Sequence, residues 1–197
     1  HSRFSLLDGI ADMEAIAATA RKMHMPAVAL TDHNNLYGAV PFFQKAKDFG
    51  VKPLIGAELS LQDSGNVIVL VKNRQGYENL CELISIGHLK GGHGHFLLPP
   101  RELFKRKEGL ILLLGGQKNS LYQLLLHRKI DKAFKNDRKW SGVFSGQLYL
   151  ELQLLTPTDV LVNRRLADFS QTLQIPITAS NNMHFIERSD WQLHQIM

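Results

Sequence analysis

The sequence has little cysteine and no long apolar run, and each shortage excludes a class of protein. Cys81 is the only cysteine among 197 residues, so an internal disulfide framework is excluded and a reducing, cytoplasmic setting fits best. No stretch of eighteen apolar residues occurs, so we expect no membrane span. No secretion leader is visible, and because the chain starts with His1 rather than Met, we expect residues before His1 to be missing.

Several patterns that bind nucleotides or supply nucleophiles are also missing. No GxGxxG follows the first predicted strand, which argues against a dinucleotide fold, and no GxxxxGK[ST] loop is present. No GxSxG pattern indicates a serine nucleophile. Cys81 lies in a predicted helix beside Glu82, which is a poor setting for a reactive thiolate. The sequence therefore shows no evident nucleophile.

The composition that remains is typical of one soluble globular domain. Hydrophobic residues make up 44% and charged residues 21%. The net charge of +5 includes two basic clusters, at residues 101–107 and 129–139. Such clusters can contact phosphates. We interpret them as solvated surface, because the positive excess is too small to indicate nucleic-acid binding by itself.

Short apolar segments with strand character alternate with helical patterns. This alternation predicts an α/β protein with a parallel sheet, and short, numerous strands favour a closed barrel over an open sheet. In a βα barrel, chemistry is expected just after the strand ends. Residues 87–100, rich in Gly and His, are predicted to form a loop. The expected strands are 27–30, 52–59, 66–71, 110–114, 148–153 and 175–179, and the expected helices are 12–23, 38–49, 76–86, 120–127, 131–139 and 158–173.

Residues of metal-ligand type follow three of these strands. His33 follows the first predicted strand, Glu58 lies at the end of the second, and His184 follows the last. His1 and Asp8 lie at the very start of the chain. Imidazole and carboxylate groups that converge from several strands can hold divalent metals, which activate water and bind the oxygens of a phosphate ester. The joint pattern predicts a metal site.

Each residue of the pattern also has a plainer interpretation. A lone His after a strand is more often a loop residue, Asp32 could cap the helix that follows, and Glu58 could be a salt-bridge partner. The pair Gly115 and Gly116 could present backbone N–H groups to a phosphate or simply form a tight turn. Histidines within helical patterns are interpreted as structural, namely His24, His88, His127 and His194.

An ordered set of motifs along nearly the whole chain resembles one family. Residues 1–9 (HSRFSLLDG) resemble an opening in which a His-x-His pair precedes Ser or Thr and Leu-Asp-Gly. Matching signatures follow at residues 29–38, 52–58 and 179–185. The chain is similar to the N-terminal PHP domain (polymerase and histidinol phosphatase type) of bacterial C-family DNA polymerases, which include DNA polymerase III alpha subunits and error-prone relatives. Three further stretches favour a polymerase over a free-standing PHP phosphatase: 76–80, 108–111 and 149–152.

The resemblance implies a fold, a domain organisation and a ligand set. The fold would be a distorted (β/α)7 TIM-like barrel of the PHP type, incomplete at the N-terminus, and residues 1–197 would form a single PHP domain as a fragment of a longer polymerase chain. Catalytic residues are unknown beyond the metal site. A divalent metal (zinc, manganese or magnesium) in a partial site and no metal at all are equal alternatives. The ligand positions would be His1, Asp8, His33, Glu58 and His184.

Three positions depart from the pattern of metal-binding members. Asn182 replaces an Asp, and an amide is a poorer ligand for a hard cation than a carboxylate. Gly116 stands where those members have the Cys of Ser-Gly-Cys, and Asn66 replaces a His. We therefore treat Asn182, Asn66 and Gly116 as a second tier of site residues, and expect a site for one or two metals rather than a full three-metal cluster.

The resemblance also implies a function. The chain would be part of a DNA-directed DNA polymerase, a nucleotidyltransferase of bacterial replication, with the polymerase carboxylates in a palm domain outside this fragment. The domain itself would be a degenerate metal-dependent phosphoesterase with a structural or partner-binding role, and residual 3′–5′ exonuclease or pyrophosphatase activity is a further hypothesis. The expected partners are DNA, a proofreading exonuclease subunit and other replisome subunits, with no membrane. The alternatives are a free-standing phosphoesterase acting on a small phosphate ester and a purely structural module without metal.

Overall fold

The chain folds into an α/β structure with two compact units. The structure is a computed structural model that describes residues 1–92, 94–194 and 196, with the backbone alone at 137 and 193. The first unit comprises His1–Glu58 and Met183–Met197, and the second comprises Leu59–Asn182. Within the described residues, every helix is too short or too polar to cross a membrane.

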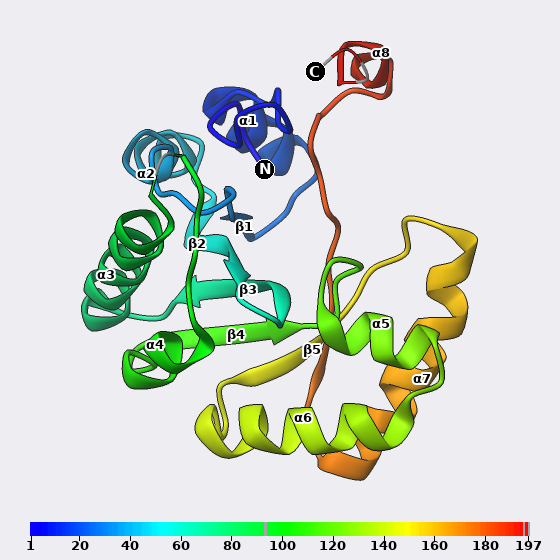
Figure 1. Ribbon diagram of the computed structural model, residues 1–197. Coiled ribbons are helices and arrows are strands. Elements are labelled where there is room, and N and C mark those ends of the chain that lie inside the picture. The colour runs from blue at the N-terminus through cyan, green and yellow to red at the C-terminus, as the bar shows by residue number, and fades with distance from the viewer. Residues whose placement is uncertain (93, 195, 197) are drawn as a thin grey trace. The chain divides into compact units, whose positions relative to one another are not determined.

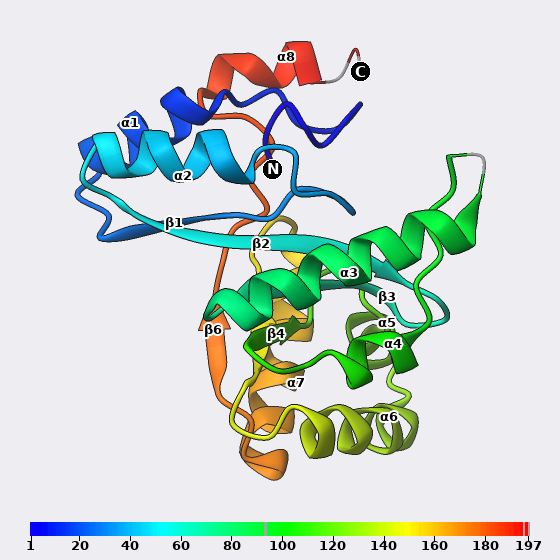
Figure 2. The same ribbon diagram turned by 90° about the vertical axis from the view of Figure 1, so that its left-hand side faces the viewer.

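The first unit places two helices beside two parallel strands. Strand β1 (Ala27–Leu30) pairs in parallel with the first residues of β2 (Lys52–Leu61). Helices α1 (Met13–Lys22) and α2 (Ala39–Asp48) lie side by side along these strands (Figure 2). The carboxyl end of β1 lies opposite Ile55, and β2 continues beyond that point.

The core of the first unit is formed by the apolar faces of its helices. Asp12 caps α1 by accepting a hydrogen bond from the peptide nitrogen of Glu14, and the buried positions of α1 recur every three to four residues. Met183 and Ile186 pack against this core and so tie the later segment of the chain to the first unit. That segment continues into the 3-10 turn η1 (Arg188–Asp190) and α8 (Trp191–His194). The core residues are Ala11, Met13, Ile16, Ala17, Leu30, Phe42 and Ala46.

After the end of β2, the described residues of the second unit contain four strands in the order β3-β4-β5-β6. They are β3 (Gly65–Val71), β4 (Leu110–Leu114), β5 (Leu148–Leu152) and β6 (Ile177–Ala179). The pairs β4–β5 and β5–β6 are parallel, whereas β3–β4 is antiparallel. The prediction of a wholly parallel sheet is therefore wrong at β3.

The reversal of β3 has a local cause. Only a three-residue turn separates β2 from β3, so the helix of a parallel crossover is missing there. Asp63 (φ 58°) and Gly65 (φ 71°) adopt the left-handed conformation that tight turns require. A carbon side chain on Gly65 would lie 2.1 Å from the carbonyl oxygen of Lys118, so only glycine fits. The sequence shows this glycine, but not the direction in which the strand pairs.

The described residues of the second unit include five helices. They are α3 (Arg74–Gly91), α4 (Pro100–Lys105), α5 (Ser120–Leu126), α6 (Ile130–Val143) and α7 (Pro157–Leu173). Helix α3 contacts β3 and β4, while α5 contacts both α6 and α7 (Figure 1). The helices cover apolar strands such as β4, in which four of five residues are buried.

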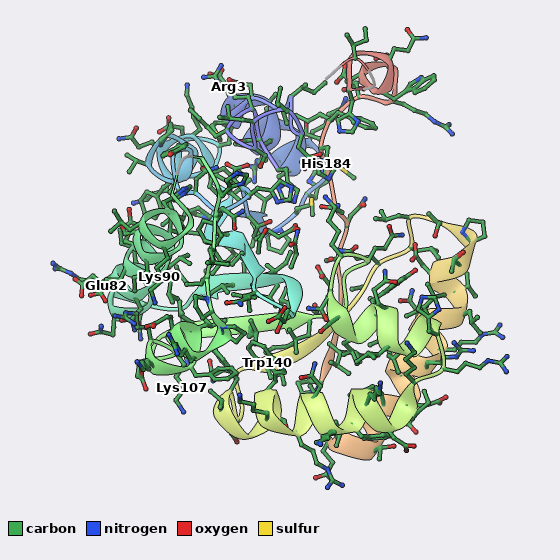
Figure 3. The ribbon with its side chains drawn as sticks, in the orientation of Figure 1. Arg3, Glu82, Lys90, Lys107, Trp140 and His184 are labelled. Atoms are coloured by element: carbon green, nitrogen blue, oxygen red, sulfur yellow. The ribbon has the colours of Figure 1, made fainter. Side chains whose placement is uncertain are left out.

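The loop predicted at residues 87–100 is confirmed at 92 and 94–99 and is wrong at 87–91 and at 100, which are helical. Helix α3 continues to Gly91 and ends at Gly92 (φ 61°), and the ring of Phe96 packs where a side chain on Gly87 would stand. Helix α4 then begins at Pro100, a favourable first position, but its six residues are too short to show a periodic pattern. Glu82 and Lys90 on α3, labelled in Figure 3, hold α4 through ion pairs to Arg106 (2.7 Å) and Glu102 (3.0 Å).

Candidate metal centre

Six side chains of the first unit form two groups of metal-ligand type. In each group, one ligand atom from every residue lies within 4.8 Å of the others. The residues come from the opening loop, from the segment after β1, from the inside of β2, and from the late segment that includes α8. The first group is His1, His33 and Glu58, and the second is Asp8, His184 and His194.

Backbone hydrogen bonds between the residues that follow β1 and the residues inside β2 bring two of the ligands together. His33 and Glu58 form a parallel β-bridge. The peptide nitrogen of Asn34 donates to the carbonyl oxygen of Glu58 (2.9 Å), and that of Glu58 donates to the carbonyl oxygen of Asp32 (3.1 Å). The two side chains therefore meet because the parallel pairing continues past the end of β1. The predicted position of Glu58 at a strand end is wrong, because β2 continues to Leu61.

Glu58 faces two imidazoles in the first group. Its Oε2 lies 3.1 Å from Nε2 of His1, and its Oε1 lies 3.6 Å from Nδ1 of His33. The rings of His1 and His33 stack with their centroids 4.1 Å apart. His1 and Glu58 are each only 7% exposed, so this carboxylate sits in a largely dry setting where cations bind strongly.

Asp8 is the centre of the second group. Its Oδ1 lies 3.2 Å from Nδ1 of His184, and its carbonyl oxygen lies 2.9 Å from Nε2 of His194. Its Oδ2 is in contact with Nε2 of His33, whose other ring nitrogen faces Glu58. His33 therefore joins the two groups.

Burial keeps His184 in the form that binds metals. Figure 3 shows this side chain beside the helices of the first unit. Burial lowers the pKa of His184, and the neighbouring His1 lowers it further, whereas Asp8 acts in the opposite direction. Neutral imidazole is the metal-binding form of histidine. The environment of His184 therefore favours coordination over protonation.

The donor set fits a divalent metal ion. Imidazole nitrogens suit zinc, and a mixture of imidazole and carboxylate also suits manganese. Within each group the ligand atoms already lie close enough to share an ion, although those of the second group come from positions as far apart as 8 and 194. When bound, such an ion would act as a Lewis acid and lower the pKa of a bound water.

The structure brings together all five ligands predicted from the sequence, and their role as ligands stays a prediction. It adds His194, which we interpreted as structural. The sequence shows no signal for this residue, because its contact with Asp8 depends on the path of the chain after His184. The interpretation of Asp32 as a helix cap is wrong. Asp32 is buried and accepts hydrogen bonds from Ser2 and Ser5, and α2 has no side-chain cap.

The second-tier residues lie in the second unit. A side chain at Gly116 would meet Oε2 of the buried Glu151 at 3.3 Å, so little room remains there. Gly115 has φ 129° and lies against the backbone of Glu151, which supports a tight turn at this glycine pair. The carbonyl oxygen of Asn66 accepts a hydrogen bond from Asn119 (2.8 Å).

Curated relatives of the chain are polymerases. The chain is 39% identical to the DNA polymerase III subunit alpha of Borreliella burgdorferi, over 96% of this chain and 18% of that protein. It is 34% identical to an error-prone DNA polymerase of Symbiobacterium thermophilum, over 100% of this chain and 20% of that protein. The chain thus spans about a fifth of the length of these relatives.

Solved structures with the same fold include two hydrolase-type proteins. One is a candidate metal-dependent phosphoesterase from Bifidobacterium adolescentis, with a TM-score of 0.61, 12% identity, and coverage of 90% of this chain and 84% of that one. The other is an amidohydrolase from Chromobacterium violaceum, with a TM-score of 0.63, 12% identity, and coverage of 100% and 94%. Both confirm the predicted α/β fold class. The sequence profile of the PHP domain matches residues 1–154, and the chain therefore belongs to the PHP domain family.

Proposed function

We propose that this chain is the PHP region of a bacterial C-family DNA polymerase of the DNA polymerase III alpha type, and that it binds divalent metal in its first unit. The observation that carries the metal proposal is the convergence of four imidazoles and two carboxylates from separate segments. The polymerase relatives, matched over 96–100% of this chain, support the wider assignment.

The ligands point to a site for one or two metals. The imidazole-rich group of His1, His33 and Glu58 suits zinc or manganese. The group around Asp8 offers one carboxylate and two imidazoles. Asn182, Asn66 and Gly116 replace the remaining ligands of metal-binding members. A reduced ligand set binds metal but supports little hydrolysis, because fewer cations stabilise the charge that develops on a phosphate.

The main role of the bound metal is structural. It would tie the opening loop of the chain to β1, β2 and the segment before α8, all within the first unit. In the whole polymerase, this region would act in the cytoplasm during DNA replication, with DNA, a proofreading exonuclease subunit and other replisome subunits as partners.

A second candidate function is a residual 3′–5′ exonuclease or pyrophosphatase activity. Two complete groups of three ligands favour it, because His33 contacts both Asp8 and Glu58 and so brings the two groups together. Two neighbouring cations can stabilise both the attacking and the leaving oxygen of a phosphate ester.

Metal content tests the proposal. The 197-residue chain is dialysed against zinc or manganese, and its metal is measured by elemental analysis in the wild type, His33→Ala and His88→Ala. His33 contacts both groups, whereas His88 is an exposed residue of α3 in the second unit and serves as the matched control. We expect near-stoichiometric metal in the wild type and in His88→Ala, and its loss in His33→Ala.

Equal metal in all three proteins, or none in any, would contradict the proposal. The same proteins are assayed with single-stranded DNA and with pyrophosphate. Hydrolysis by the wild type that is lost in His33→Ala would support the second candidate function. If the metal-loaded wild type hydrolyses neither substrate, the structural role alone is supported.

A further inference from the structure

We propose that Ser5, oriented by Asp32, fixes His1 in the tautomer that carries its proton on Nδ1, and so leaves Nε2 to bind the metal. Neither residue belongs to the two ligand groups, and both would be positioning residues. The inference rests on the metal site proposed above, but its test can be read without any metal.

Asp32 orients the side chains of Ser2 and Ser5 by accepting their hydrogen bonds. It is 1% exposed and accepts three hydrogen bonds. The peptide nitrogen of Ser2 donates to its Oδ1 (2.6 Å), the hydroxyl of Ser2 donates to its Oδ2 (2.8 Å), and the hydroxyl of Ser5 donates to its Oδ1 (2.8 Å). A buried carboxylate can only accept, so both hydroxyl protons must point toward it.

The hydroxyl of Ser5 has one proton and two lone pairs to share among three neighbours. The proton goes to Asp32. One lone pair accepts the peptide N–H of His33 (3.1 Å). The third neighbour is Nδ1 of His1, also at 3.1 Å. Because Ser5 has no second proton to donate, this hydrogen bond forms only if Nδ1 of His1 carries the proton.

A proton on Nδ1 of His1 affects what the other ring nitrogen, Nε2, can bind. A neutral His1 with its proton on Nδ1 presents a lone pair at Nε2, which lies 3.1 Å from Oε2 of Glu58. Two acceptors then face each other in a buried site, and they require a cation between them. A divalent metal supplies it, and in the metal-free chain a proton on Nε2 takes its place. Hydrogen bonds to the second nitrogen of a metal-binding histidine generally set its tautomer in this way.

The test reads the tautomer directly. The metal-free 197-residue chain, labelled with ¹⁵N-histidine, is examined by NMR. We expect Nδ1 of His1 to carry a proton, because Ser5 can only accept from it. In Ser5→Ala this acceptor is lost, so Nδ1 of His1 should no longer carry the proton and Nε2 should donate to Glu58. Zinc and manganese affinity, measured by calorimetry, should fall about 10- to 100-fold.

Two further variants sharpen the comparison. In Asp32→Asn the amide oxygen must stay where Oδ1 is now, because the N–H of Ser2 and the hydroxyl of Ser5 both point there. We therefore expect the tautomer to be kept. Ser85→Ala removes an exposed serine of α3 in the second unit and serves as the matched control, with both readouts unchanged.

A wild-type spectrum in which Nδ1 of His1 carries no proton would overturn the inference, and so would an unchanged Nδ1 in folded Ser5→Ala. If Ser5→Ala does not fold, the wild-type spectrum alone decides. A wild type that has the expected tautomer but binds no metal would refute the proposed function and leave the hydrogen-bond arrangement standing.

Discussion

Gly9→Ala should disrupt the metal centre without removing a single ligand. Gly9 is buried and donates its peptide N–H to the carbonyl oxygen of Ser5 (2.9 Å). A methyl group on Gly9 would lie 2.2 Å from the carbonyl oxygen of Ser2, 2.8 Å from its carbonyl carbon and 3.2 Å from the carbonyl carbon of His1. The clash therefore falls on the backbone that carries a ligand.

The expected loss of stability follows from the overlap between the new methyl group and the carbonyl of Ser2. Ordinary contacts of a methyl group begin near 3.4 Å, so the Ser2 carbonyl must retreat by about 1 Å. It cannot retreat freely, because it accepts a hydrogen bond from the peptide nitrogen of Ser5 (2.8 Å) and because Asp32 holds the peptide nitrogen of Ser2. Overpacking of this kind costs about 1–3 kcal/mol of unfolding free energy. Displacement of His1 should lower metal affinity by about 10- to 100-fold.

Denaturant unfolding and calorimetric metal titration measure both effects. Gly142→Ala is the matched control, because a methyl group there meets nothing within 4 Å and the residue lies inside helix α6. It should be neutral or stabilise by up to about 1 kcal/mol, since alanine favours a helix more than glycine does. If Gly9→Ala matches Gly142→Ala in both stability and metal affinity, the reasoning about this close approach is refuted.

Two other predictions concern the second unit. Burial raises the pKa of Asp159, but hydrogen bonds from Tyr122, Gln117 and the backbone outweigh this and lower it to about 2 from the usual 3.8. This stabilisation is present above pH 3.8 and is lost as the pH falls toward about 2. Tyr122→Phe should therefore cost about 1–3 kcal/mol of unfolding free energy at neutral pH and less in acid; an equal cost at both pH values would contradict this. Asn182→Asp should raise bound metal in elemental analysis, because a carboxylate binds hard cations better than an amide, and Asn181→Asp is its control; equal metal in both variants would argue against a ligand position at 182.

The sequence was a good guide to elements whose signals are local. The apolar spacing of α1 and its cap Asp12 lie within one segment, so the helix could be predicted closely. The five predicted ligands also stand at predicted strand ends or in the opening motif, and parallel strands bring such ends together whatever the details of packing. Local signals failed for α4, because six residues cannot show a helical period.

What only the tertiary structure decided depends on contacts between distant segments. The pairing of β3 with β4 joins segments some forty residues apart, and no local pattern in the sequence shows which strands pair. His194 joins the site because Met183 and Ile186 anchor the late segment against the core around α1. From the sequence alone, Asp32 could be a helix cap. The structure shows that Ser2 of the opening loop donates hydrogen bonds to it instead. Hydrogen bonds and packing between remote residues leave no pattern in the sequence, so the choice between a capping residue and a positioning residue needs the folded chain.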